Sequence, residues 1–185
     1  MKRLAVILPY NEQHIENFTE HFRATVQEGD DLYYKLIFMK QKSNRPLNKG
    51  KLFNIGYMLH KDTFDYFCFH DVDLIPDEVD YSYTEYPIHL ATNLSKDDYK
   101  ECWEYYFGGV TLFNKQDFIN INGSLITEGK EIIFSCFNRS APTRRLRPYT
   151  TFGLVRFASR KGKSANTARF KTLPPSGVLS PKIPL

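Results

Sequence analysis

The chain has 185 residues, 42% hydrophobic and 15% aromatic, a composition that suits one globular domain with a buried core and argues against disorder. Its apolar stretches are only about strand length, and the start of the chain is typical of a strand rather than a signal peptide. We therefore expect no transmembrane segment and a cytoplasmic location, and three cysteines without CxxC spacing argue against a zinc site or a disulfide framework.

The net charge of +4 is unevenly distributed along the chain. Residues 1–123 hold 13 Lys and Arg against 19 Asp and Glu, whereas residues 124–185 hold 12 against 2. The second part shows no sustained helical or strand period apart from residues 132–137 and 152–157. The sequence therefore predicts a domain at 1–123 and an irregular, poorly ordered basic tail at 124–185.

Strand-like and helix-like segments alternate through the first part of the chain. The predicted elements, in chain order, are a strand at 3–9, a helix at 12–27, a strand at 33–39, a helix at 48–61, strands at 64–70, 88–92 and 105–113, and a short helix at 115–120. In the helix at 48–61, Asn48 is the expected N-cap, and Leu52, Ile55 and Leu59 are expected on one apolar face. This order implies right-handed crossovers and an α/β fold with a mainly parallel central sheet.

The strongest local signal is HDVDLIP at residues 70–76, in which Asp71 and Asp73 follow a buried strand. Side chains at i and i+2 leave a strand on the same side, and paired carboxylates suit a divalent cation that neutralises a diphosphate. The alternative is an ordinary polar turn, where Asp is common. Since ligands bind at the carboxyl ends of parallel strands, we expect Pro9-Tyr10-Asn11, after the first strand, to lie beside Asp71-Val72-Asp73.

Two further motifs carry weaker signals. In LNKGKLFNIGY, residues 47–57, Lys49 and Lys51 lie on the first turn of a helix, where phosphate binds well, although two lysines on a helix are more often a solvated face. In YYFGGVTLF, residues 105–113, a Gly-Gly pair interrupts an aromatic strand. A sugar approaching the backbone is one explanation of the pair, and a β-bulge is the other.

Taken in order, these motifs and the following NKQDFINING resemble the beta-1,4-galactosyltransferase family over residues 3–123. The resemblance implies a GT-A fold, Rossmann-type and nucleotide-sugar-binding. It also implies inverting transfer of galactose or N-acetylgalactosamine from a UDP-sugar donor to a glycan acceptor, with Mn²⁺.

The resemblance also implies roles for individual residues. Pro9, Tyr10 and Asn11 would hold the uridine end; Leu47, Asn48 and Lys49 would contact the nucleotide; Asp71, Val72 and Asp73 would form the DVD motif, with Asp73 as metal ligand; and Tyr106, Phe107, Gly108 and Gly109 would line the sugar and acceptor sites. The chain departs from the family's Arg-rich turn at Asn11 and Glu12, and Lys49 stands where the family often has arginine, so the bidentate fork is lost.

The resemblance stops at Gly123. No Trp, Asp or His follows that residue, so the acidic loop that supplies the family's catalytic base and the histidine that completes its metal site are absent from this sequence. Glu128 and Glu131 are the only acids beyond it, and neither is assigned as the base. A one-base deletion near codon 123 and a genuinely divergent tail both explain the break.

The leading hypothesis is thus a metal-dependent hexosyltransferase, with activity impaired if the acidic loop is lost. A catalytically inactive nucleotide-sugar-binding remnant of the same fold is the second. A nucleic-acid-binding protein that uses the basic tail is the third. The tail lacks an RNP-like motif and interleaved aromatic residues, so we expect no nucleic-acid partner.

Overall fold

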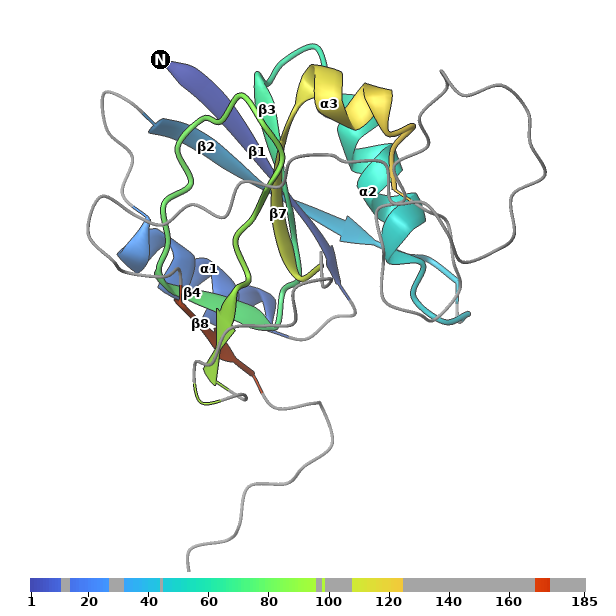
Figure 1. Ribbon diagram of the computed structural model, residues 1–185. Coiled ribbons are helices and arrows are strands. Elements are labelled where there is room, and N and C mark those ends of the chain that lie inside the picture. The colour runs from blue at the N-terminus through green and yellow to red at the C-terminus, as the bar shows by residue number, and fades with distance from the viewer. Residues whose placement is uncertain are drawn as a thin grey trace, which may run out of the picture.

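The computed structural model describes residues 1–10, 14–26, 32–43, 45–95, 98, 108–124 and 169–173. Its elements, shown in Figure 1, are β1 (Lys2–Tyr10), α1 (Ile15–Thr25), β2 (Leu32–Lys40), α2 (Lys49–His60), β3 (Tyr66–His70), β4 (Leu74–Glu78), β5 (Ile88–His89), β6 (Asn93–Leu94), β7 (Val110–Asn114), α3 (Lys115–Asn120) and β8 (Arg169–Thr172). The α/β class is confirmed, and the predicted strands and helices up to α3 occur in the predicted order, together with two strands, β4 and β6, that were not predicted.

A five-stranded sheet with the order β2-β1-β3-β7-β5 forms the centre of the fold. β1 pairs in parallel with both β2 and β3, as the alternation of strands and helices predicts. β7 runs antiparallel to β3, and β5 runs antiparallel to β7. The parallel arrangement therefore holds for the three strands joined by α1 and α2, and the sheet as a whole is mixed.

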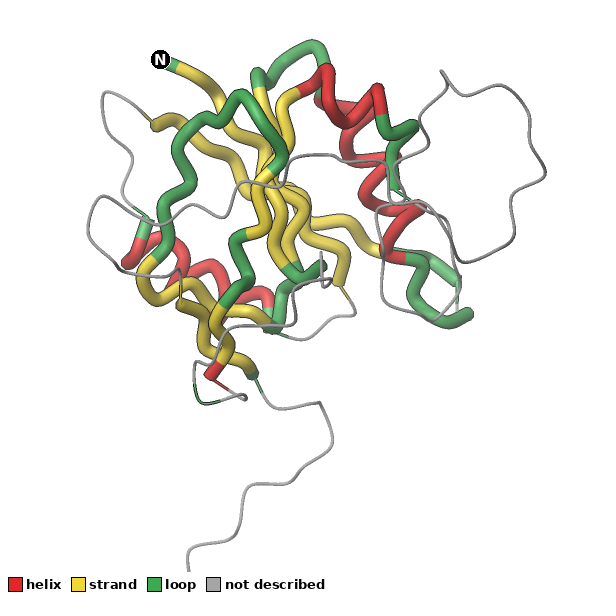
Figure 2. The backbone as a smooth tube through the Cα atoms, in the orientation of Figure 1, coloured by secondary structure: helices red, strands yellow, loops and turns green. Residues whose placement is uncertain are grey.

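Alternating side chains divide the core into two layers, one on each face of this sheet. Leu4, Val6 and Leu8 of β1 face a cluster that includes Phe18 and Phe22 of α1. On the other face, Ala5 and Ile7 join a second cluster, which contains residues of α2 and α3. Figure 2 shows the strands running between these two helical layers. A strand buried on both faces accounts for the continuous apolar run at the start of the sequence.

The predicted apolar face of α2 is only partly the face that packs. Leu52 is buried as predicted, but Ile55 and Leu59 are exposed, at 39% and 68%, and Phe53 and Tyr57 are buried in the core instead. Gly56 explains the choice, because a Cβ atom at this position would lie 2.7 Å from Cγ2 of Ile7. The glycine lets the helix approach β1 closely, and the aromatic residues around it then fill the space against the sheet.

A second sheet, with the order β4-β8-β6, lies beside the first. Its central strand comes from residues 169–172, which the sequence analysis placed in an irregular tail, so that prediction is wrong for this segment. Phe170 is completely buried in the α1-side cluster, and Lys171 forms an exposed ion pair with Asp77 of β4 at 3.1 Å. Four residues are too few for a visible period, which is why the pattern did not reveal the strand.

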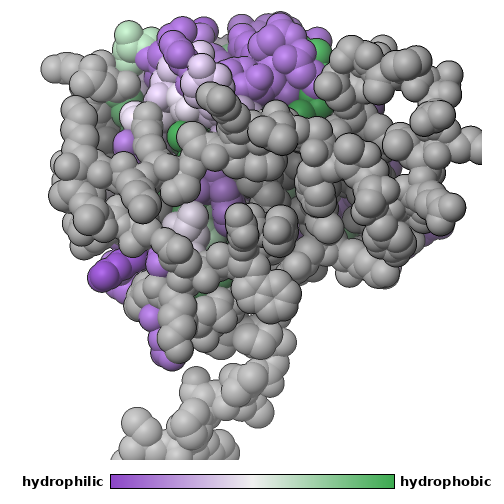
Figure 3. Space-filling view, viewed as in Figure 1, coloured by the Kyte–Doolittle hydropathy of each residue, from purple (hydrophilic) through white to green (hydrophobic). Residues whose placement is uncertain are grey.

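Hydrophilic side chains gather along the upper edge of the molecule in Figure 3, where α3 lies. The carboxyl ends of β1 and β3 lie at the opposite, lower edge in Figure 1.

Candidate functional site

Segments that are distant in the sequence meet where β3 ends. β1 and β3 are parallel with Ile7 opposite Phe69, so Pro9 and Asp71 take the corresponding positions two residues further along the same edge. The first turn of α2 reaches this edge, since Lys49 bonds to Asp71. The topology thus brings together the turn after β1, the start of α2 and the DVD turn, as the parallel strands predict.

Lys49 and Asp71 form an ion pair across this edge. The Lys49 ammonium lies 2.7 Å from Asp71 Oδ2, and the two side chains are 35% and 18% exposed. Lys49 is the first residue of α2, and the side chain of Asn48 caps the helix by accepting the N–H of Lys51 at 2.9 Å. An ammonium group at a helix N-terminus is an arrangement that attracts phosphate.

The side chain of Gln41, directly after β2, holds the loop that leads into α2. Its amide nitrogen donates to the carbonyls of Arg45 and Pro46, at 2.9 and 3.2 Å, and its own oxygen accepts the N–H of Asn48 at 3.0 Å. Leu47 lies half-buried in the same loop. Gln41 was not among the predicted site residues; the available signal was a polar side chain that follows a strand at the edge where ligands are expected.

The Gly-Gly pair joins the edge through its backbone. Gly109 has a φ of +72°, a left-handed conformation that favours glycine, and its carbonyl accepts the N–H of Asp71 at 2.8 Å. The carbonyl of Gly108 accepts a hydrogen bond from Nε2 of His89 at 2.8 Å. This left-handed turn by itself accounts for a glycine at position 109, without a bulge in the ladder between β3 and β7.

The DVD motif forms a turn, which corrects the prediction that its two carboxylates leave a strand on the same side. Val72 and Asp73 are turn residues, and the N–H of Leu74 donates to the carbonyl of Asp71 at 3.1 Å. Strand alternation therefore does not apply here. Asp73 is exposed, whereas Asp71 is partly buried against Lys49, and the carbonyl of Asp73 accepts the N–H of Leu173 at 2.8 Å.

The chemistry of this edge fits a hard divalent cation. Carboxylate oxygen is the ligand that such cations prefer, and the exposed carboxylate of Asp73 supplies it. Asp71 fits less well, because the ammonium of Lys49 already balances its charge. Within the ranges that the structure describes, no group of three or more His, Cys, Asp or Glu side chains could hold a metal ion. A cation at Asp73 would thus complete its coordination with oxygens of a bound anion and with water.

For the remaining predicted site residues, the structure gives the burial of Pro9 and Tyr10 and does not describe three others. Pro9 is buried and Tyr10 is half-buried, with its ring edge-on to that of Phe38 at a centroid distance of 6.1 Å. Three predicted positions lie outside the described residues: Asn11, Tyr106 and Phe107.

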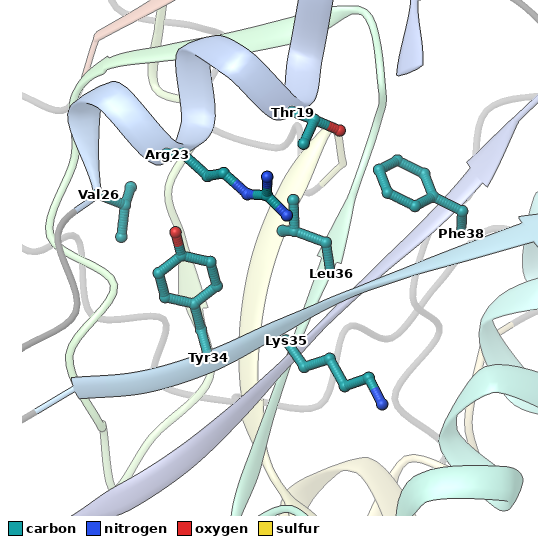
Figure 4. Close-up of a pocket in the computed structure, with 7 residues that line it drawn as sticks. All are labelled: Thr19, Arg23, Val26, Tyr34, Lys35, Leu36 and Phe38. Atoms are coloured by element: carbon teal, nitrogen blue, oxygen red, sulfur yellow. The ribbon is translucent and has the colours of Figure 1, made fainter. Parts of the chain in front are cut away.

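A surface cavity of about 740 Å³ lies between α1 and β2, apart from the predicted site residues. Figure 4 shows Thr19 and Arg23 of α1, with Val26 directly after the helix, on the side of the cavity that faces Tyr34 and Leu36 of β2. It lies on the α1 face of the sheet, whereas α2, which carries Lys49, packs on the other face. The cavity and the DVD turn are therefore separate features, and the convergence of motifs, not the cavity, marks the candidate site.

The mixed sheet, the helix N-terminus and the DVD turn at its carboxyl edge define an α/β fold of the GT-A class. Two solved structures share it: the catalytic domain of Drosophila beta-1,4-galactosyltransferase 7 with xylobiose (TM-score 0.61, 23% identity, 68% of this chain and 54% of that one), and a mutant of the same enzyme with manganese, UDP-Gal and xylobiose (TM-score 0.60, 24% identity, 67% and 53%).

Sequence comparison identifies the family. Residues 1–85 match the N-terminal region of glycosyl transferase group 7, and residues 88–124 match the N-terminal domain of galactosyltransferase. Beta-1,4-galactosyltransferase 4 of Mus musculus is 33% identical over 129 residues, which are 66% of this chain and 37% of that protein. Human beta-1,4-galactosyltransferase 1 is 32% identical over 126 residues, which are 65% of this chain and 32% of that protein. The chain belongs to the beta-1,4-galactosyltransferase family, and it spans about a third of the length of these relatives.

The predicted cytoplasmic location is wrong by this comparison, because beta-1,4-galactosyltransferases are Golgi membrane enzymes. The prediction rested on the start of the chain, and a chain that aligns with a third of its relatives carries no information about segments outside the match. In the described part of the chain, no helix is long and apolar enough to cross a membrane.

Proposed function

We propose that this chain binds the UDP-sugar donor of a galactosyltransferase, with its diphosphate at the edge formed by α2 and the DVD turn. The observation that carries the proposal is the position of Asp71, whose carboxylate contacts Lys49 and whose N–H donates to Gly109. The three family motifs that contain Lys49, Asp71 and Gly109 thus meet at Asp71. A relative of the same fold was solved with manganese and UDP-Gal, which supports a UDP-sugar as the ligand.

Residues of the chain take separate roles in this proposal. Lys49 and the first turn of α2 bind the diphosphate, and Leu47 and Asn48 form the loop against the nucleotide. Pro9, Tyr10 and Asn11 are the residues we propose for the uridine end. The remaining positions, at the sugar and acceptor sites, are Tyr106, Phe107, Gly108 and Gly109. Galactose is the sugar favoured by the relatives, all of which are named for it.

Manganese would bind at Asp73, whose exposed carboxylate suits it. When bound, the ion stabilises negative charge on the departing diphosphate. The chain contributes a fixed turn, since both ends of the Asp71–Leu74 turn are hydrogen-bonded.

Transfer also requires a base that takes the proton from the acceptor hydroxyl as the new bond forms with inversion. Glu128 and Glu131 are the acids available after Gly123, and both lie outside the described residues. Donor binding and transfer are therefore separate questions. If the chain binds the donor but transfers no sugar, it is the catalytically inactive, nucleotide-sugar-binding remnant of the fold.

Donor binding is tested by thermal unfolding with UDP and MnCl₂, alone and together. At a hundred times the dissociation constant, a ligand stabilises the folded state by about 2.7 kcal/mol, which corresponds to about 5 to 10 °C in Tm for a chain of this size. We expect such a rise with both ligands present, and we expect Asp73→Asn to lose the manganese-dependent part. An unchanged Tm in the wild type would remove the proposal.

Turnover of UDP-galactose with simple sugar acceptors then separates the two remaining hypotheses. A galactosylated product identifies a transferase. Binding without product identifies the remnant.

A further inference from the structure

His70, the last residue of β3, lies immediately before the DVD turn but points into the core. Its side chain is completely buried. Aromatic rings surround it, with centroid distances of 5.0 Å to Phe18, 5.9 Å to Phe170 and 6.1 Å to Tyr81. A phenylalanine would fill such a place with less desolvation, so the polar ring calls for an explanation.

Two hydrogen bonds define the state of this ring. Nδ1 lies 2.9 Å from the carbonyl of Asp71, and a carbonyl only accepts, so Nδ1 carries the proton. Nε2 is then an acceptor, and it receives the hydroxyl of Tyr81 at 2.9 Å. Burial lowers the pKa of His70 to about 3 and raises that of Tyr81, so both groups are neutral at pH 7, in agreement with these roles.

The chain beyond His70 is held through the same carbonyl. The carbonyl of Asp71 accepts both Nδ1–H of His70 and the N–H of Leu74, which closes the turn that carries Asp73. Tyr81 is also held in place, because its backbone carbonyl accepts a hydrogen bond from the hydroxyl of Tyr66 at 2.9 Å. A set of hydrogen bonds, buried at Tyr66 and Tyr81 and part-buried at Asp71, thus runs from the core to the peptide between Asp71 and Val72.

We propose that His70 is a positioning residue for the metal-binding turn: its Nδ1–H, held by Tyr81, sets the orientation of the Asp71 peptide and hence of the Asp73 carboxylate. The inference rests on the proposed function, since Asp73 is the expected manganese ligand. Side chains that orient metal ligands through hydrogen bonds commonly change metal affinity about 10- to 100-fold when they are lost.

The test compares His70→Phe with His70→Asn in the full chain. Phenylalanine keeps the ring in its aromatic surroundings and removes the donor, whereas the Asn amide nitrogen occupies nearly the place of Nδ1 and restores the donor in a smaller side chain. We expect His70→Phe to weaken manganese-dependent UDP binding about tenfold or more, measured by isothermal titration calorimetry. We expect His70→Asn to recover most of that affinity although it packs less well and unfolds at a lower temperature. A purely structural role predicts the reverse order.

Equal affinity for UDP and manganese in the wild type and both variants would overturn the inference, as would equal weakening in both variants. The proposed function fails separately, if the wild type does not bind. The inference is then decided by hydrogen exchange without ligand. The inference is supported if the Leu74 amide exchanges faster in His70→Phe than in the wild type and at the wild-type rate in His70→Asn. The amides of β2 should exchange at the same rate in all three proteins. Equal exchange of the Leu74 amide in all three proteins refutes the inference.

Discussion

Lys49 places a positive charge where a diphosphate is expected, and without a nucleotide Asp71 balances that charge at 2.7 Å. The pair is part-buried, so its ammonium is less screened by water than a fully exposed one. An incoming diphosphate then competes with Asp71 for the ammonium, and the helix N-terminus adds to the attraction. Lys51, two residues further along the same turn, is exposed and serves as a matched control.

We predict that Lys49→Met weakens UDP binding about 10- to 100-fold, because a hydrogen bond to a charged group contributes about 1.5 to 3 kcal/mol. Lys51→Met removes the same charge from the chain and is expected to change the affinity less than threefold. Calorimetric titration with UDP at fixed manganese measures both. Similar losses in the two variants would show that net charge, and not the position of Lys49, attracts the nucleotide.

At the scale of elements, β8 connects a distant part of the chain to the DVD turn. It pairs with β4 on both sides of an irregularity between Pro76 and Glu78, and Leu173, the residue after it, donates its N–H to the carbonyl of Asp73 at 2.8 Å. Pro76 is tolerated in β4 because this strand lies at the edge of its sheet. The turn is therefore held from the core by His70 and from the second sheet by Leu173.

We predict that Leu173→Pro lowers manganese-dependent UDP affinity severalfold relative to Leu173→Ala. Both substitutions remove the leucine side chain, but only proline removes the N–H that the Asp73 carbonyl accepts, a hydrogen bond with a net contribution of about 0.5 to 1.5 kcal/mol. Titration calorimetry gives the affinity, and urea unfolding gives the change in stability. If the proline and alanine variants bind equally, the hydrogen bond does not hold the turn.

For the whole molecule, His89 makes folding stability depend on pH. Burial lowers its pKa from 6.5 to about 4, and the hydrogen bond to Gly108 opposes part of this shift. The unfolded chain therefore binds a proton more readily than the folded one. Stability from this residue is fully present above about pH 6.5 and is lost as the pH falls towards 4, at up to about 1.4 kcal/mol per pH unit.

We predict that His89→Gln reduces this slope, because the Gln amide can donate to the Gly108 carbonyl without titrating. Urea unfolding of both proteins at half-unit steps between pH 4 and 7 measures it, and the difference between wild type and variant should widen by up to about 1.4 kcal/mol for each unit of decrease between about pH 6.5 and 4. Parallel curves would show that His89 does not titrate differently in the folded and unfolded states.

The sequence by itself determined the alternating strands and helices of the central sheet, the cap at Asn48, and the family, but not the short strands β4 and β6. These features follow from local periodicity, capping chemistry and ordered motifs, all of which are written along one stretch of chain. Parallel topology, which follows from the alternation of strands and helices, also places Pro9 and Asp71 at one edge.

Tertiary structure alone decided the contacts that hold that edge. Asp71 pairs with Lys49, 22 positions away, and Leu173 donates to the carbonyl of Asp73 across 100 positions, while His70 is buried beneath the turn. No local pattern records such contacts. The face by which α2 packs was likewise decided by Gly56 meeting Ile7, because a helix with apolar residues on several sides buries whichever side approaches the sheet most closely.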